Sequence, residues 1–495
     1  MARIRHDGAL LPRLAFDPAA FFTYLLPPII FHAGLSVEKS SFFSHLDRIM
    51  LLGVAGTVLN CTLIAGGVGA AVSWLGGFPL SLRDVLAIGA VFGATDTVAT
   101  LQVLDARAAP ALFSLVLGEG CVNDAMSLVL LRAVEALPAH ARGGSSSGGA
   151  ADVAELVARF AYLFVCSTAL GLLVGLAAAA TARFVSHRTG GAAASDATVP
   201  LEVAVVGVLA YISFLLAEAV HLSGILSLFA AALAVSHYAM RCLSRGARST
   251  TLHAFETLSF VCEQLIFLYT GVAALDRAAW AIARPGEVLV LIATIGVLLL
   301  AGRAVTVAAV MVTSKLLGAR RAMSAREACV VWWAGLMRGA VSVAIATHHF
   351  AVVAPGTAHA ALPPDGTPAA EEMRTHASVV ATSFIIVLAS TVVFSAGTRP
   401  FLSRVLPSAM AGTATAQRDA ANGAWPGVDL PLQEEELVPR RQGDDDGGED
   451  APLLHRLWRA ADERYLAPLL GGPAAWEAQE QAARDERYTE LLSRG

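Results

Sequence analysis

Eleven long hydrophobic segments, separated by polar or Gly/Pro-rich stretches, fill the chain as far as about residue 400. Most of them approach the roughly 20 apolar residues that a helix needs to cross a bilayer. The pattern therefore predicts an all-α polytopic membrane protein with about eleven transmembrane helices. The segments lie near 18–34, 49–74, 85–104, 110–137, 153–183, 199–217, 219–240, 256–275, 286–313, 326–352 and 376–397.

The composition agrees with this pattern. Of the 495 residues, 56% are hydrophobic and only 15% are charged, whereas soluble proteins average about 45–50% apolar and about 25% charged residues. The net charge of −5 comes mainly from an acidic stretch near the C-terminus, and no basic stripe suggests nucleic-acid binding. The six cysteines stand singly in apolar segments, so neither a metal cofactor nor a disulfide is expected.

Three parts are predicted along the chain: an N-terminal segment (1–16), a transmembrane domain (17–400) and a cytosolic, largely disordered tail (401–495). A Pro/Gly-rich loop is expected at 354–372. The loops after the fifth, seventh and ninth segments are rich in arginine, and such loops usually lie in the cytosol. The basic residues are Arg183, Arg188, Arg241, Arg245, Arg248, Lys315, Arg320, Arg321 and Arg326.

Polar residues inside the fourth segment, GEGCVNDAMSLVLL, point to the chemistry. Glu119, Asn123 and Asp124 stand there among apolar residues. A carboxylate at membrane depth costs between about 3 and more than 10 kcal/mol, so it usually faces a water-filled cavity or a partner on an ion path. Burial disfavours the charged form of a carboxylate, so Asp124 is expected to exchange a proton for a transiently bound cation.

A second interruption falls in the third segment, GAVFGATDTVATLQVL, at Thr95 and Asp96. A break in the helix there exposes backbone carbonyls and helix-end dipoles, which secondary transporters use to bind ions near the middle of the membrane. The alternative is an ordinary N-cap, with Thr95 and Asp96 starting a new helix after a loop.

Arg303, in VLLLAGRAVTVAAV, is the most deeply placed cation. Arginine does not lose its proton, so a buried one needs a carboxylate partner. Glu119 is the preferred partner and Glu263 the second choice. The alternative is an arginine that reaches back to the lipid headgroups.

Three further polar residues stand in or between apolar segments. Arg338, flanked by glycines in WWAGLMRGAVSVAIA, predicts a second broken helix. Glu263 lies in mid-segment with little polar company, which favours a functional or charge-pairing role. Glu218 lies between two segments, where a solvent-exposed turn is an equal alternative.

Six motifs in order resemble the sodium/proton exchanger (monovalent cation:proton antiporter) family: LLPPIIFHAGLSVEKSSFF, FGATDTVATLQVL, LVLGEGCVNDAMSLVL, LAEAVHLSGILSLF, TLSFVCEQLIFLYTGVAALD and WWAGLMRGAVSVAIA. The resemblance runs from about residue 17 to about 405 and is closest to the plant vacuolar-type Na⁺(K⁺)/H⁺ antiporters. It implies thirteen helices in an inverted-repeat fold with two broken crossing helices, and a homodimer that works by elevator-like alternating access.

The resemblance also implies roles for individual residues. It assigns ion binding to Asp124, Asn123, Asp96 and Thr95, a structural salt bridge to Glu119 and Arg303, and crossing-helix or accessory polar positions to Arg338, Glu263 and Glu218.

Three departures from the family pattern stand out. The chain begins at what resembles the third family helix, so the first two helices, one of which helps to build the dimer, are expected to be missing. Thr97 replaces the usual proline or serine, and Gln264 stands where threonine commonly follows the acid.

The sequence thus predicts a secondary transporter, an electroneutral Na⁺ or K⁺/H⁺ antiporter of an endomembrane such as the vacuole, endosome or Golgi. Such a protein controls luminal and cytosolic pH and cation content. No HExxH, GxSxG or Walker A motif supports an enzyme or an ATP-driven pump. The rival hypothesis is a truncated, non-transporting paralogue that acts as a membrane scaffold or a negative partner. A channel is a weaker alternative.

Overall fold

The computed structural model describes residues 20–37, 45–75, 80–104, 108–136, 149–188, 198–274, 277–316, 323–350 and 367–406. The regular elements within these ranges are all helices, and they contain no strand. The predicted N-terminal segment and nearly all of the predicted tail lie outside the described residues.

The prediction of an all-α polytopic membrane protein is confirmed. Nine helices of the described part are long and apolar enough to cross a membrane, and each coincides with one of the eleven hydrophobic segments. They are Leu46–Trp74, Leu82–Leu101, Pro110–Glu135, Ala154–Val185, Val199–Ala219, Gly224–Cys242, Gly246–Ala274, Pro285–Leu316 and Ala370–Val405.

The two remaining segments are also helical. The first forms a shorter apolar helix, Phe21–Ser36. The segment 326–352 is divided into two ten-residue helices, α16 (Ala325–Ala334) and α17 (Ala340–His349).

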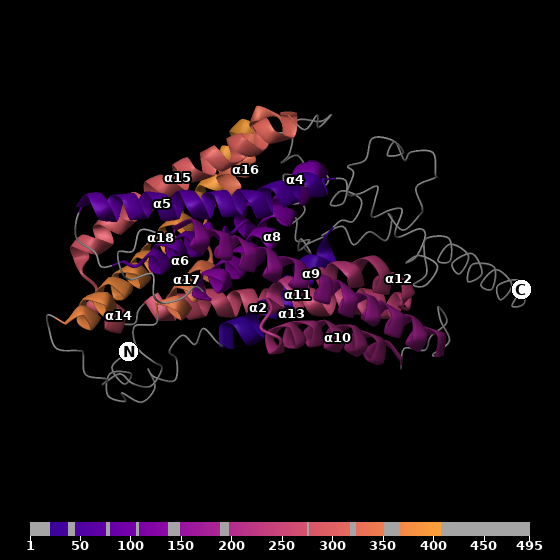
Figure 1. Ribbon diagram of the computed structural model, residues 1–495. Coiled ribbons are helices and arrows are strands. Elements are labelled where there is room, and N and C mark those ends of the chain that lie inside the picture. Colours follow the sequence, from indigo (N-terminus) through magenta and orange to yellow (C-terminus); the bar gives the residue numbers. More distant parts are fainter. Residues whose placement is uncertain are drawn as a thin grey trace, which may run out of the picture.

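The other elements follow the chain in order (Figure 1). The first are η2 (Phe21–Leu25), α2 (Leu26–Ser36), α4 (Leu46–Met50), η3 (Leu51–Gly56), α5 (Thr57–Leu75), α6 (Leu82–Gly93), α7 (Val98–Leu101), α8 (Pro110–Glu135) and α9 (Gly149–Arg188). The rest are α10 (Val199–Ala219), α11 (Gly224–Ala234), η6 (Val235–Ala239), α12 (Met240–Cys242), α13 (Arg245–Ala274), α14 (Arg277–Ile282), α15 (Pro285–Leu316) and α18 (Pro368–Val405).

Several helices begin earlier than their apolar segments because polar residues cap them. Ser81 and Ser324 each form a capping box, with Asp84 and Glu327 three residues on. The Thr367 side chain accepts from the Ala370 N–H, which starts α18 at Pro368. The predicted loop at 354–372 is therefore wrong in its last residues, which are helical.

The helices form two bundles that lie side by side (Figure 1). In what we call the crossing bundle, α5–α8 pack with α15–α18. In the second bundle, α2 and α9–α13 pack with one another. The helix α8 is enclosed between the two bundles. In its most apolar stretch of 18 residues 89% are buried, against 28% in the corresponding stretches of α10, α13 and α15. Glu119 and Asn123, in the middle of α8, are therefore inside the protein, away from lipid.

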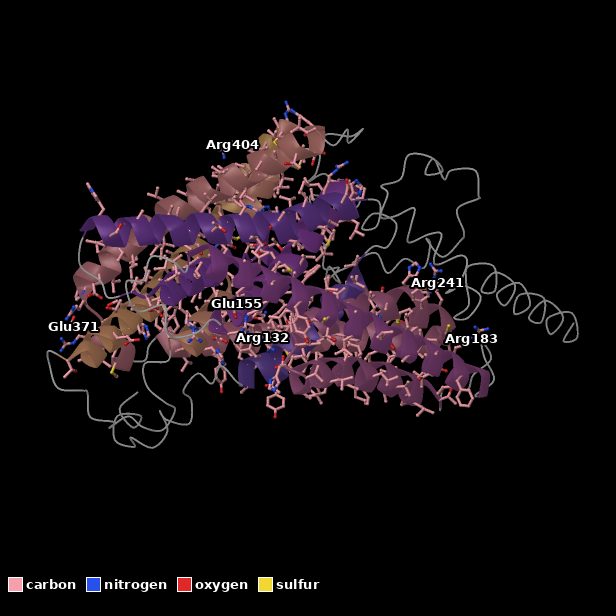
Figure 2. All side chains as sticks on the ribbon, viewed as in Figure 1. Arg132, Glu155, Arg183, Arg241, Glu371 and Arg404 are labelled. Atoms are coloured by element: carbon pink, nitrogen blue, oxygen red, sulfur yellow. The ribbon has the colours of Figure 1, made fainter. Side chains whose placement is uncertain are left out.

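The labelled charged residues show which ends of the helices lie together. Arg183 and Arg241 project at one end of the molecule, and Glu371, which pairs with Arg284 and Arg374, lies at the opposite end (Figure 2). Two of the three arginine-rich loops predicted from the sequence thus share an end.

Candidate functional site

Two helix breaks meet inside the crossing bundle. One lies between Gly93 and Val98, where α6 gives way to α7, and the other separates α16 from α17. The Asp96 N–H donates to the Met337 carbonyl oxygen at 3.0 Å, which joins the two breaks directly through the backbone. The two interrupted helices therefore cross where their backbone groups are free of intrahelical bonds.

The alternative that the sequence left open was an ordinary N-cap at Thr95 and Asp96. In the structure the N-cap of α7 is Thr97, which makes no side-chain capping bond, and Asp96 Oδ1 accepts from the Val98 N–H at 3.1 Å from one residue further back. The second break passes close by, since a Cβ added to Gly339 would lie 2.8 Å from Asp96 Oδ2. Asp96 thus contacts both breaks, and a side chain at Gly339 would displace its carboxylate.

Asn123 holds α8 to the first break. Its Nδ2 donates to Thr95 Oγ1 at 2.6 Å, while its Oδ1 accepts from Thr57 Oγ1 at 2.9 Å and from Ser127 Oγ at 3.4 Å. Thr57 and Ser127 are partners that sequence reasoning missed. A single hydroxyl in an apolar helix gives no sign of which distant residue it will meet.

Asp124, beside Asn123, differs from its neighbours. Asn123, Glu119 and Thr95 are 1–3% exposed, whereas Asp124 and Asp96 are only part-buried. No hydrogen bond from the described residues reaches the Asp124 carboxylate. The charges of Asp96, Glu119 and Arg338 act on it. Asp124 is therefore a part-buried carboxylate with no hydrogen-bond partner among the described residues.

Glu119 lies one helical turn before Asn123 and faces Arg303 of α15. Arg303 Nη1 and Nη2 donate to the two carboxylate oxygens at 2.9 Å each. Nη2 also donates to the Val331 carbonyl oxygen at 2.9 Å, so the pair ties α8 and α15 to α16. A bidentate geometry of this kind is the strong form of the interaction. Glu263, the second-choice partner, lies on α13 and accepts a hydrogen bond from Ser259 of the same helix.

Arg338 is fully buried within the second break. Its Nη1 donates to the carbonyl oxygens of Gly335 at 2.7 Å and Met337 at 3.0 Å, which the break leaves without helical partners. Ser390 and Thr391 of α18 bond to its backbone N–H and carbonyl. Arg338 thus brings a positive charge to the crossing, and its guanidinium group supplies hydrogen bonds to backbone carbonyls of the broken helix.

The two accessory acids lie apart from this centre. Glu263, on α13, accepts from Ser259 Oγ at 3.2 Å, and its charge interacts with that of Asp96. Glu218 ends α10 and pairs with Arg132 of α8 at 2.6 Å, so it is more than an exposed turn residue.

The available ligands fit a weakly held cation. The described residues contain no group of three or more His, Cys, Asp or Glu side chains that could hold a metal ion. The crossing offers the carboxylates of Asp96 and Asp124, whose oxygen atoms are hard ligands suited to alkali cations.

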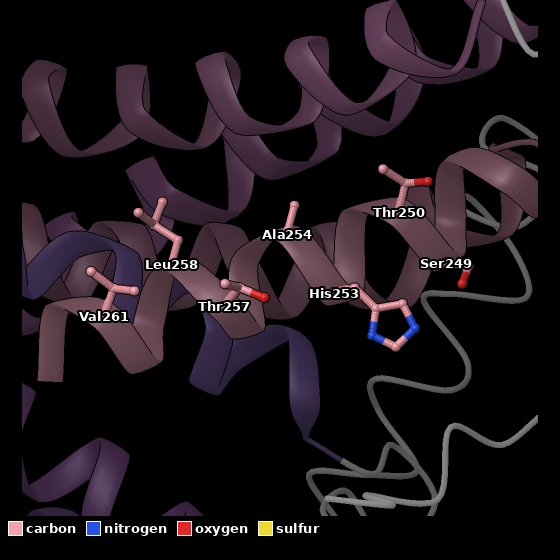
Figure 3. A pocket seen from close by; sticks show the side chains of 7 residues that line it. All are labelled: Ser249, Thr250, His253, Ala254, Thr257, Leu258 and Val261. Carbon is pink, nitrogen blue, oxygen red and sulfur yellow. The ribbon is translucent and has the colours of Figure 1, made fainter. Parts of the chain in front are cut away.

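A separate hollow of about 620 Å³ lies along the outer face of α13, lined by residues that include Ser249, His253, Thr257 and Val261 (Figure 3). None of the predicted site residues lines it.

Known proteins share both the sequence pattern and the fold. Residues 4–404 match the family described as "Sodium/hydrogen exchanger, transmembrane". Sodium/hydrogen exchanger 2 of Arabidopsis thaliana is 35% identical over 480 residues, covering 93% of this chain and 82% of the relative. Sodium/hydrogen exchanger 1 of Oryza sativa subsp. japonica is 35% identical over 468 residues, covering 92% and 82%.

Among solved structures, the sodium proton antiporter MjNhaP1 from Methanocaldococcus jannaschii superposes with a TM-score of 0.56 at 16% identity. The match covers 80% of this chain and 92% of that one. At this identity the likeness concerns the fold, which is that of an antiporter.

Proposed function

Because the chain belongs to the sodium/hydrogen exchanger family of multi-pass membrane cation/proton antiporters, we propose that it exchanges Na⁺ or K⁺ for a proton at the Asp124 carboxylate. The exchange proceeds by alternating access, so the protein is a secondary transporter and not an enzyme. The observation that carries the proposal is the backbone bond between the two helix breaks, Asp96 N–H to the Met337 carbonyl, with the free Asp124 carboxylate beside it.

The proton and the cation compete for the same oxygen atoms. Asn123 is held by Thr57, Thr95 and Ser127, and Glu119 is bound by Arg303, so neither is free to take up a proton or a cation. Asp124 has no such partner among the described residues. A protonated carboxylic acid and a carboxylate with a bound Na⁺ or K⁺ are both neutral, and either avoids the cost of a bare charge at membrane depth.

The charges at the crossing support one-for-one exchange. Asp96, Glu119 and Asp124 contribute three negative charges when ionised, and Arg303 and Arg338 contribute two positive charges. One negative charge remains in excess, and one proton or one monovalent cation neutralises it. An electroneutral cycle follows, because the site is neutral whichever ligand it carries across the membrane.

The orientation of the protein, its membrane and its oligomeric state are further parts of the proposal. The arginine-rich end of the molecule (Figure 2) is assigned to the cytosol by the bias of basic residues, and the tail after α18 goes with it. The motifs shared with plant vacuolar-type antiporters favour an endomembrane, where the protein controls luminal pH and cation content. A homodimer is proposed from the same resemblance.

Transport into sealed vesicles tests the proposal. The purified chain is placed in proteoliposomes with an acidic interior, and Na⁺ or K⁺ is added outside. We expect the interior to become alkaline with at least one cation, and Asp124→Asn to abolish the response. Asp47→Asn makes the same chemical change at an exposed carboxylate of α4 and should leave transport intact.

Full activity in Asp124→Asn would disprove the role of this carboxylate. A wild-type protein that responds to neither cation, although correctly folded, would favour the non-transporting scaffold instead.

A further inference from the structure

Arg132 connects the two bundles at a point that the exchange chemistry does not use. It lies on α8, eight residues after Asp124 and so about 12 Å along the helix axis. Its Nη2 is 2.6 Å from Oε1 and 2.8 Å from Oε2 of Glu218, at the end of α10. Its Nη1 donates to the Leu222 carbonyl oxygen at 2.5 Å. The helix that carries the cation site is therefore fastened to the α10–α11 turn of the second bundle.

Backbone hydrogen bonds within the α10–α11 turn fix its conformation independently of Arg132. The backbone of the turn closes α10 with bonds from Leu222 N–H to Ala217 O at 2.8 Å and from His221 N–H to Glu218 O at 3.1 Å. This is a Schellman motif, whose C′ position needs a left-handed residue. His221 fills it with φ of 59°, and it is the one non-glycine with positive φ in the described part of the chain. Such a conformation is uncommon outside glycine.

The Glu218 carboxylate is fixed from the other side as well. Its Oε1 accepts from the Gly224 N–H at 3.0 Å, at the start of α11. A Cβ on Gly224 would lie 2.6 Å from that oxygen. The turn therefore presents a carboxylate and a carbonyl oxygen to Arg132 whether or not the arginine is bound.

The exposure of this pair distinguishes it from the pair at the crossing. The side chains of Arg132 and Glu218 are 35% and 34% exposed, against 3% and 1% for Arg303 and Glu119. A pair that water reaches can separate at a lower cost, since water solvates both partners when they part. A buried pair cannot separate without leaving two charges uncompensated. Of the two pairs, only Arg132–Glu218 is suited to form and break in each cycle.

We propose that Arg132 and Glu218 form a latch for exchange. The pair holds the helix with Asn123 and Asp124 against the second bundle in the conformation described here, and it opens when the cation site turns to the other side of the membrane. Arg132 is thus a positioning residue for transport. The inference rests on the proposed function, because a latch has a role only if the two bundles move relative to each other.

Reversible cross-linking tests whether the latch must open. In Arg132→Cys/Glu218→Cys, a bifunctional methanethiosulfonate reagent should stop cation-dependent alkalinisation, and dithiothreitol should restore it in the same vesicles. The recovery shows that the blocked protein is folded. The matched control is Glu155→Cys/Arg159→Cys, which replaces an exposed ion pair of 2.7 Å within the single helix α9. Cross-linking within one helix should leave the rate unchanged.

A charge-reversal series asks the same question without a reagent. Arg132→Glu and Glu218→Arg should each change the maximal rate by roughly fivefold or more and leave the KM for the cation unchanged, because the latch does not touch the site. The double reversal should recover part of the lost difference, because it restores the ion pair but not the bonds to the Leu222 carbonyl and from the Gly224 N–H. Unchanged transport in the cross-linked pair, or no recovery in the double reversal, would overturn the latch. Absence of exchange in the wild type would instead refute the proposed function.

Discussion

At the scale of single residues, burial separates the side chains that hold the fold from those available to an ion. Glu119, Asn123 and Thr95 have all their polar partners inside the protein, whereas the Asp124 carboxylate is part-buried and has no hydrogen-bond donor among the described residues. Two carboxylates five residues apart on α8 thus have different environments: Glu119 is paired with Arg303, and Asp124 has no hydrogen-bond partner among the described residues.

Removing one partner of the buried pair should damage stability. Glu119→Ala leaves Arg303 charged at 3% exposure, so we expect a loss of about 3–5 kcal/mol, measured as a lower melting temperature and a lower yield of monodisperse protein. Glu155→Ala, which breaks an exposed pair with Arg159, should cost about 0–1 kcal/mol. Equal melting temperatures for wild type and Glu119→Ala would mean that the pair does not hold the crossing bundle together.

The hydroxyl of Thr57 should matter for ion binding more than for folding. Thr57→Val removes the hydroxyl that Asn123 Oδ1 shares, at 2.9 Å, with the Gly53 carbonyl oxygen of the same turn. Asn123 beside Asp124 then loses an orienting bond worth at most about 1.5 kcal/mol, so the KM for the cation should rise by up to about twelvefold. Thr62→Val is the control, because Thr62 is an exposed residue of the same helix that bonds only to the backbone of its own turn. An equal KM in both variants would show that Thr57 has no part in cation binding.

At the scale of elements, the apolar segments predicted the nine described helices that are long enough to cross a membrane, because length and hydrophobicity are local properties. The two interruptions were also visible, since Thr95, Asp96 and Arg338 are costly in an unbroken apolar helix. The bond from Asp96 N–H to the Met337 carbonyl could not be predicted, nor could the pairing of Arg132 with Glu218. Each depends on which distant segments pack together, and the hydrophobic pattern does not contain that information.

The crossing of the broken helices leaves room only for glycine. A Cβ at Gly335 would overlap the guanidinium of Arg303, so Gly335→Ala should displace the arginine from Glu119 and lower both the melting temperature and the rate of exchange. Gly296→Ala places a methyl group on the same helix as Arg303 with no neighbour within 4 Å. That control should be neutral or stabilising by up to about 1 kcal/mol. A tolerated Gly335→Ala would show that the break and α15 are less tightly packed than described.

At the scale of the whole molecule, the fold gathers the carboxylates of Asp96, Glu119 and Asp124 and the guanidinium groups of Arg303 and Arg338 around the junction of two helix breaks, with α8 at the centre. The proposed one-for-one exchange predicts that the complete cycle moves no net charge. In proteoliposomes on a solid-supported membrane, a step in Na⁺ or K⁺ concentration should produce a change in internal pH without a sustained current. A sustained current that scales with the pH change would show unequal numbers of protons and cations per cycle.

The central claim is that one carboxylate, Asp124, serves the proton and the cation in turn. The most direct measurement is the KM for the external cation in wild-type proteoliposomes as the external pH is lowered at fixed internal pH. If the two ligands compete for Asp124, the KM rises, by up to about tenfold per pH unit once the carboxyl group is mostly protonated, and the maximal rate stays constant. A maximal rate that falls with pH while the KM stays constant would contradict the account, because proton and cation would then bind at separate groups.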